Sequence, residues 1–176
     1  FYNKIIELNH NNKKINIFRP IRKEKYYSVG DIVVVGDIMP EETKLYGGAV
    51  AFPIDYELIY DNKNINESDI ISIWKPIPPR GYISIGYIFN NTYDKPGLED
   101  MVCVASEYTL ETDIEDVNGS LFTRNTDMGQ AFSLWKKKSD NDTIIDPFLV
   151  SASIFKPSRF DNIAFKIVEM DKDFND

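Results

Sequence analysis

The chain has 176 residues, of which 43% are hydrophobic and 27% are charged, and its net charge at pH 7 is −8. This length suits a single domain that buries most of its apolar surface without disulfides or metals. The negative charge argues against nucleic acid as a partner, because nucleic acid favours a basic surface. The one histidine, His10, lies in a polar, Asn-rich segment. It would have to act alone there, which argues against Cys-His catalysis and a histidine-rich metal site, so we expect no enzyme and no cofactor.

The first predicted elements are strands. Tyr2 to Leu8 has strand character, Ile15 to Phe18 alternates as a second short strand, and DIVVVGD, residues 31–37, indicates a buried strand between turn residues. We expect the N-terminal strand to pair with the C-terminal end of the chain. That closure would cover two sheet edges at once.

Six basic residues crowd into this first part of the chain with few acids between them, namely Lys13, Lys14, Arg19, Arg22, Lys23 and Lys25. Such a cluster is a candidate site for phosphate or lipid headgroups. A solvated basic loop is the alternative interpretation, and the sequence leaves both open.

A proline-rich stretch follows near the middle of the chain. Residues 76–81, PIPPRG, predict a rigid turn at the rim of a sheet, since each proline fixes φ and removes a backbone donor. A preformed turn loses little entropy on binding, so Pro78, Pro79, Arg80 and Tyr82 are candidate partner-binding residues. A turn that only reverses the chain is the other interpretation.

Two features further along the chain indicate structure rather than chemistry. Cys103 falls in an apolar strand, which favours a small core residue over a nucleophile. The acids between Glu107 and Asp127 lack the spacing of an EF-hand loop, so we expect a solvated connection and no metal site.

No apolar run approaches the roughly 20 residues of a membrane span, and we expect a cytoplasmic piece of a longer protein.

The chain also contains an internal repeat. Three aromatic residues, which we call the anchor residues, are each followed by a proline at an identical separation, and the pairs are Phe18 with Pro40, Trp74 with Pro96 and Trp135 with Pro157. The first two units also share Pro20 with Pro76 and Gly30 with Gly86, whereas the third has Lys137 and Pro147 at those positions. Each unit then reaches a short apolar strand, listed in chain order as Val50 to Phe52, Val102 to Val104 and Ile163 to Phe165.

A repeat of this length predicts an architecture built from equivalent units. We expect an all-β fold in which three four-stranded units, approximately residues 15–60, 71–112 and 132–170, form a β-prism. None of these small sheets could bury its apolar face alone. The anchor residues are therefore expected to line a shared core.

The middle unit resembles a known family. Residues 71–90, ISIWKPIPPRGYISIGYIFN, and 94–104, DKPGLEDMVCV, combine an aromatic anchor, a Pro-x-x-Pro-x-Gly-Tyr element, a Ser-x-Gly step and a Lys-Pro pair. This combination resembles the vacuolar-protein-sorting-related repeat family, whose signature is also found in the adaptor-binding region of bridge-like lipid-transfer proteins. The resemblance covers Ile17 to Phe52 in part and Leu134 to Phe165 only at its anchor, its Lys-Pro pair and its last strand.

The resemblance implies a non-enzymatic module that docks a protein or peptide, or a peripheral membrane, at an organelle. The expected binding mode is addition of an extended ligand to a sheet edge. Two alternatives stay open, a β-prism that binds phospholipid headgroups and a carbohydrate-binding prism. The Gln-x-Asp-x-Asn-x-Val-x-Tyr signature of one lectin class is absent from all three units.

Overall fold

The computed structural model describes residues 2–10, 12–40, 45–65, 67, 69–116, 119–125, 131–138, 148–157 and 164–168. In these residues the fold is all-β, as predicted, and the helical content is one 3-10 turn at Ser106–Tyr108. The strands of the N-terminal half are β1 Tyr2–His10, β2 Lys13–Pro20, β3 Tyr27–Ser28, β4 Ile32–Val35, β5 Leu45–Tyr46, β6 Val50–Ala51, β7 Asp55–Asp61, β8 Ser72–Ile77, β9 Tyr82–Ile83 and β10 Ile88–Asn90. Those of the C-terminal half are β11 Cys103–Ala105, β12 Thr109–Thr112, β13 Ile114–Glu115, β14 Phe122–Asn125, β15 Ala131–Lys137, β16 Leu149–Ser151 and β17 Ala164–Ile167.

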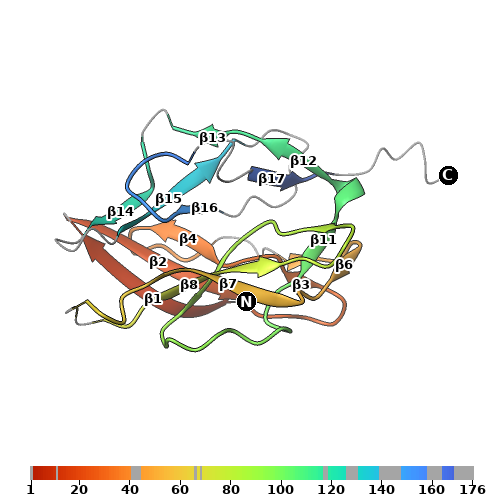
Figure 1. The fold of residues 1–176 in the computed structure, drawn as a ribbon, viewed down its shortest axis with the longest axis horizontal. Helices are drawn as coiled ribbons and strands as arrows, with labels where there is room; N and C mark the ends of the chain where they lie inside the picture. Colours follow the sequence, from red (N-terminus) through yellow and green to blue (C-terminus); the bar gives the residue numbers. More distant parts are fainter. Residues whose placement is uncertain are drawn as a thin grey trace.

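These strands form several small sheets rather than one large sheet. Three of them have a long central strand, with the orders β1-β2-β4, β10-β8-β7 and β13-β15-β14, and β16 also pairs with β15. The shorter strands form β6-β11-β9, β12-β17 and β3-β5. Figure 1 shows the sheet of β15 in the upper half of the view and those of β2 and β8 in the lower half.

The three central strands carry the anchor residues in the same register. Phe18 pairs with Ile32, Trp74 with Ile88 and Trp135 with Leu149, so the separation between anchor and partner is the same in each sheet. The repeat seen in the spacing of anchors and prolines therefore recurs in the pairing of strands.

Each central strand also pairs on its other side, with one continuous strand in the first two sheets and with two separate strands in the third. In β1 and β7 a β-bulge lies opposite the anchor and the residue before it, between Lys4 and Ile6 and between Leu58 and Tyr60. In the third sheet the chain leaves β15 at this point. There, β13 pairs with Lys136 and Lys137, while β14 pairs with Ala131 to Leu134. At the position of the bulge, the partner strand of the third sheet is thus divided into β13 and β14.

The main core is built by the residues that precede the anchors. Side chains alternate between the two faces of a strand, so the residues one and three positions before each anchor share a face. These six side chains are fully buried in one cluster, and they are Ile15, Ile17, Ile71, Ile73, Phe132 and Leu134.

The predicted burial of the anchors is correct, since all three are at most 7% exposed. Their predicted place in one shared core is wrong for two of them, because only Trp135 belongs to the main cluster. Trp74 packs in a separate cluster with Tyr56, Ile88 and Met101, and the ring of Phe18 contacts that of Tyr2.

Each tryptophan anchor takes part in a hydrogen-bonded clasp. Trp74 Nε1 donates to Ser72 Oγ at 2.8 Å, and Ser72 Oγ donates to the carbonyl of Thr92 at 2.6 Å. Trp135 Nε1 and Ser133 Oγ repeat this arrangement at 2.7 Å and 2.6 Å, with the carbonyl of Ser153 as the acceptor. The clasp holds the loop after the outer strand against the start of the central strand.

Residues at equivalent positions also contact one another between sheets. A Cβ built on Gly30, whose φ is +151°, would lie 2.8 Å from the Cα of Gly86. Asp31 N donates to the carbonyl of Tyr87 at 2.8 Å, and the ring of Tyr87 stacks on Phe148 with 6.3 Å between centroids. Gly30 and Gly86 are equally far in sequence from their anchors. Asp31, Tyr87 and Phe148 are likewise equivalent, each one position further along. Pro147, which corresponds to the two glycines, lies outside the described residues.

The predicted closure by the N-terminal strand is wrong. Among the described strands, β1 pairs with β2 alone, and β17 at the C-terminal end pairs with β12. β1 pairs with β2, the next strand in sequence, because closing a short hairpin costs less conformational entropy than bringing the two ends of the chain together.

Three further expectations need correction. β4 is half-buried rather than buried. Pro76 lies in β8 opposite Tyr56 and not in the turn, which is possible because β10 pairs with β8 only from Ser72 to Trp74. The acidic stretch expected to be a connection contains β12, β13 and β14, because Ile114 and Phe122 are buried and pair with β15; Asp127 lies outside the described residues.

Lys137, which replaces the proline of the other units, is 1% exposed. Its Nζ donates to the carbonyl of Ile85 at 2.5 Å and to that of Phe165 at 2.7 Å. A buried ammonium needs such acceptors to offset the loss of its hydration. Lys137 therefore connects β15 to the middle unit and to β17.

Candidate functional site

The proline-rich turn lies between β8 and β9, as predicted. Tyr82 N donates to the carbonyl of Pro79 at 3.1 Å, and Gly81 has a φ of +85°, which glycine adopts readily. Arg80 at the tip is exposed, and no ion pair connects it to another described residue. Pro78 and Pro79 are half-buried and hold the tip in place.

An open strand edge adjoins this turn. β9 pairs with β11 through Tyr82 opposite Ala105 and Ile83 opposite Val104. In the order β6-β11-β9 it is the outer strand. Ser106 N also donates to the carbonyl of Gly81 at 3.0 Å, which fixes the turn to the end of β11. The four residues predicted as a partner-binding tip therefore lie together, next to backbone groups that another strand could pair with.

The predicted basic cluster is divided in the structure. Lys14 forms ion pairs with Glu7 at 3.3 Å and Asp37 at 2.9 Å, and the hydrogen bond to Asp37 raises the pKa of Lys14. Lys13 Nζ donates to the carbonyl of Ser120 at 3.3 Å. These two lysines lie at the start of β2, whereas residues 22–25 follow its other end, so the six basic residues do not form one surface.

Arg22, Lys23 and Lys25 remain together on the exposed turn before β3. The guanidinium carbon of Arg22 lies 4.3 Å from the ring centroid of Tyr27 and 5.7 Å from that of Phe52, which favours a cation–π contact. Arg22 Nη2 also donates to Tyr27 Oη at 3.0 Å. We use the name basic corner for the exposed residues Ile21, Arg22, Lys23, Lys25 and Tyr26.

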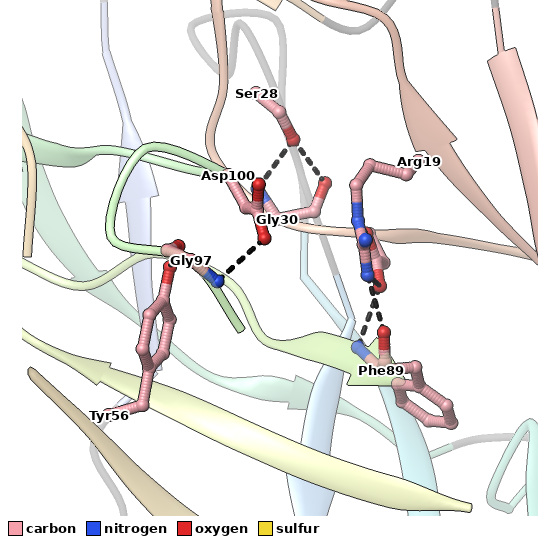
Figure 2. A network of polar contacts seen from close by, with 8 residues as sticks. Arg19, Ser28, Gly30, Tyr56, Phe89, Gly97 and Asp100 are labelled. Carbon is pink, nitrogen blue, oxygen red and sulfur yellow. Dashed lines mark hydrogen bonds and ion pairs between the residues drawn. The ribbon is translucent and has the colours of Figure 1, made fainter. Parts of the chain in front are cut away.

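Arg19, the sixth residue of the cluster, takes part in a buried network. Its Nε lies 2.9 Å from Asp31 Oδ1, and its Nη2 donates to Asp31 Oδ2 at 3.1 Å and to the carbonyl of Phe89. Phe89 N donates to Asp31 Oδ2 at 2.7 Å. Figure 2 shows Arg19 lying against Phe89 of β10. The fully buried Asp31 thus links the first sheet to the second.

The same region contains a second set of polar contacts (Figure 2). Tyr56 Oη donates to the carbonyl of Gly97 at 2.9 Å, and Gly97 N donates to Asp100 Oδ2 at 2.8 Å. Ser28 Oγ donates to the carbonyl of Gly30 at 3.1 Å and accepts from its N at 3.2 Å. Burial, followed by the charge of Asp100, raises the pKa of Tyr56. These contacts fix loops and strand ends, and they offer no activated nucleophile.

The link that Asp31 forms between the two sheets is not predicted by the sequence pattern. Its signal was an acid directly before an apolar strand and directly after a glycine, a pattern that also fits an exposed turn. Only the approach of β10, which is distant in sequence, distinguishes the two.

Cys103 behaves as predicted. Its side chain is fully buried, and burial raises the pKa of its thiol to about 12. Among the residues that the structure describes, no group of three or more acidic, histidine or cysteine side chains is placed to hold a metal ion. Within the same residues, no helix has the length and hydropathy to cross a membrane.

Comparison with protein families finds a match over most of the chain. The family model described as vacuolar protein sorting-associated protein 62 matches residues 22–159, which is well over half of the chain. A search of curated proteins finds no match.

A solved structure with a similar fold is that of GNIP1Aa from Chromobacterium piscinae. Its TM-score is 0.72 at 18% sequence identity, and the similarity covers 92% of this chain and 33% of that one. The chain therefore spans about a third of the length of GNIP1Aa, and at this identity the likeness concerns the fold alone.

Proposed function

The chain belongs to the vacuolar protein sorting-associated protein 62 family, and from this premise we propose that it is a non-enzymatic docking module of a membrane-trafficking or lipid-transfer protein. In this proposal it corresponds to the adaptor-binding region of bridge-like lipid-transfer proteins and works in the cytoplasm at an organelle membrane. Its ligand is a protein or peptide.

The proposed architecture is a β-prism of three units. Three observations support it: the common register of anchor and outer strand in all three sheets, the six core residues at equivalent positions, and the contacts of Asp31 with Tyr87 and of Tyr87 with Phe148. Contacts between equivalent residues are expected when units are related by rotation about a common axis, since residues close to the axis then meet.

The ligand site in this proposal is the proline-rich turn with the edge of β9. The observation that carries it is an exposed Arg80 without an ion pair among the described residues, beside an outer strand. An extended peptide would pair with β9 through its backbone, and Arg80 would form a charge-assisted hydrogen bond with a carboxylate of the ligand. Tyr82 on β9 would contact a neighbouring ligand side chain.

Selection of peptides from a random phage-displayed library tests this function. We expect selected peptides to be extended and to carry an acidic residue, and their affinity can be measured by fluorescence polarisation. Arg80→Glu should weaken binding at least about tenfold, because truncating a hydrogen-bonded charge pair costs about 2 kcal/mol or more.

Lys63→Glu is the matched control, since Lys63 is an exposed lysine in the connection between β7 and β8. It makes the same change of charge away from the turn and should leave affinity unchanged. Equal losses in both variants would indicate a general effect of charge and would contradict a site at the turn. Failure to select any peptide above background would count against the docking function.

A second candidate function is binding of anionic lipid headgroups at the basic corner. The supporting observation is the grouping of Arg22, Lys23 and Lys25 on one exposed turn beside Phe52. Binding to vesicles that contain phosphatidylserine should then fall as salt rises, and it should be lost in an Arg22→Glu, Lys23→Glu, Lys25→Glu variant. No sedimentation with such vesicles at low salt would exclude this function.

A further inference from the structure

Three loops at equivalent positions follow the outer strands β4, β10 and β16. They comprise residues 36–40, 92–96 and 153–157, and each ends in the proline that recurs after its anchor. The first residue of each loop accepts a hydrogen bond through its carbonyl from the side chain two positions before the anchor. The three bonds are Asn16 to Gly36 at 2.8 Å, Ser72 to Thr92 at 2.6 Å and Ser133 to Ser153 at 2.6 Å.

Two of these loops present large apolar side chains to solvent. Phe155 is 72% exposed, Ile38 63% and Met39 62%, and with Ile54 they are the most exposed large hydrophobic residues of the described chain. Phe155 and Ile38 both lie two positions before the recurring proline, where the middle unit has Asp94. The two loops thus expose a large apolar side chain at the same position relative to the anchor and the recurring proline.

In the three-unit arrangement proposed above, these loops lie at one end of the molecule. Each outer strand is antiparallel to its central strand, so each loop returns to the end where the central strand begins. Gly36 N accordingly donates to the carbonyl of Lys14 at 2.8 Å. Rotation about one axis, as in that arrangement, would place the three loops at the same level along the axis.

Three of the four charged side chains of these loops form ion pairs. Asp37 Oδ1 lies 2.9 Å from Lys14 Nζ, Lys95 Nζ lies 2.7 Å from Asp55 Oδ1, and Lys156 Nζ lies 2.8 Å from Asp116 Oδ2. Both lysines of the three described loops are therefore paired with an acid, and within these loops no unpaired positive charge selects an anionic partner. Their exposed apolar side chains remain available for contact with a partner.

We propose that this end of the molecule docks on the uncharged interfacial region of a phospholipid membrane and inserts Phe155, Ile38 and Met39. A lipid surface deforms around separate apolar tips, whereas a folded protein would need a matching pocket for each. Aromatic and aliphatic side chains are favourable at this depth. Asp94 on the third loop stays hydrated and limits insertion to the interface.

Flotation with phosphatidylcholine vesicles, which carry no net charge, tests this surface. The protein should float with these vesicles, and raising sodium chloride from about 0.1 to 0.5 M should leave binding unchanged, since screening acts on charges alone. Phe155→Ser, and separately the pair Ile38→Ser with Met39→Ser, should each lower the partition coefficient at least about tenfold.

Ile54→Ser is the matched control, because Ile54 is 62% exposed but lies before β7, outside the three loops. It should float like the unchanged protein, and circular dichroism should show that all variants are folded. A Phe155→Trp variant adds an independent readout, since its fluorescence should shift to shorter wavelength when vesicles are added.

Two results would overturn the proposal. One is that the protein does not float with phosphatidylcholine vesicles. If it then binds only vesicles with anionic lipid, and salt abolishes this binding, the membrane contact belongs to the basic corner. The other is flotation that Ile54→Ser reduces as much as Phe155→Ser. Peptide capture by the proline-rich turn is measured without vesicles, so the two proposals fail separately.

Discussion

Asn16 and Phe18 occupy in the first sheet the positions of Ser72 and Trp74 in the second, but they form only half of the clasp. Asn16 Nδ2 reaches the carbonyl of Gly36, while Asn16 Oδ1 is buried and has no hydrogen-bond partner among the described residues. Phe18 lacks the N–H that Trp74 donates to Ser72. The first sheet therefore has the same hydrogen bond to its loop as the other two sheets, but Asn16 Oδ1 stays without a donor among the described residues.

Removing the clasp of the second unit should destabilise the protein. In Ser72→Ala, Trp74 Nε1 and the carbonyl of Thr92 both lose their hydroxyl partner. Trp74 is buried, and a buried donor left unpaired costs about 1–3 kcal/mol. Urea denaturation should show a loss in this range. Ser106→Ala, at an exposed serine, should change stability by less than about 0.5 kcal/mol; similar values for both would refute the role of the clasp.

The ion pair between Arg19 and Asp31 should contribute more than the pairs at the surface. Asp31→Ala removes the carboxylate that accepts from Arg19 and from the N–H of Phe89, so that Arg19 keeps only the carbonyl of Phe89. Breaking a buried pair costs about 3–5 kcal/mol. Asp116→Ala breaks an exposed pair with Lys156, which typically contributes at most about 1 kcal/mol. Denaturation of both variants tests this order, and an equal effect would contradict it.

The close approach of two glycines should make Gly30 intolerant of any side chain. In Gly30→Ala the new Cβ would lie 2.8 Å from Gly86 Cα, so backbone would have to move. Gly36→Ala is the control, because Gly36 also has a positive φ, of +87°, but has nothing within 4 Å. We expect Gly30→Ala to lower the free energy of unfolding by about 1–3 kcal/mol more than Gly36→Ala does. Equal losses would mean that conformation alone matters at Gly30.

Cys103 should be unreactive in the folded protein. Burial raises the pKa of its thiol to about 12 from the ordinary 9.0, so almost no thiolate exists at pH 8. Alkylation by iodoacetamide should be slow at this pH and become fast in guanidinium chloride. Because the folded-state pKa is the higher one, this group stabilises the fold fully below pH 9 and loses that contribution as the pH rises towards 12.

Rapid alkylation of the native protein at pH 8 would contradict the burial of Cys103. Treatment with guanidinium chloride supplies the internal control, because the same thiol reports both states.

The sequence was sufficient to identify which residues are equivalent. The constant separation between each anchor and its proline predicted three units, and the pairing of each anchor with its partner on the outer strand follows the same repeat. Local signals of this kind survive because each sheet needs its own aromatic residue and its own turn.

Contacts between units were beyond the sequence. Lys137 stands between Lys136 and Lys138, where it looks like part of a solvated basic run, yet strand alternation buries it alone of the three. Asp31 likewise resembles a turn residue until β10 approaches. Both positions depend on segments of another unit, and no local pattern in one sequence reports such an approach.

The candidate tip was found because prolines restrict the chain in a way that depends only on neighbouring residues. The exposed loop residues Ile38 and Phe155 were not singled out, since an isolated apolar residue in a loop is common. Their equivalence becomes visible only when the registers of the strands are known.

If the chain is divided into the three proposed units, the short sheets combine strands from different units, which affects how the protein folds. β6 of the first unit pairs with β11 of the second, and β12 from the end of the second pairs with β17 of the third. In a linear array of repeats, each repeat folds almost independently and stability grows by addition. Here a unit removed from the chain would leave strands of its neighbours without partners, so we expect all three to unfold in one cooperative transition.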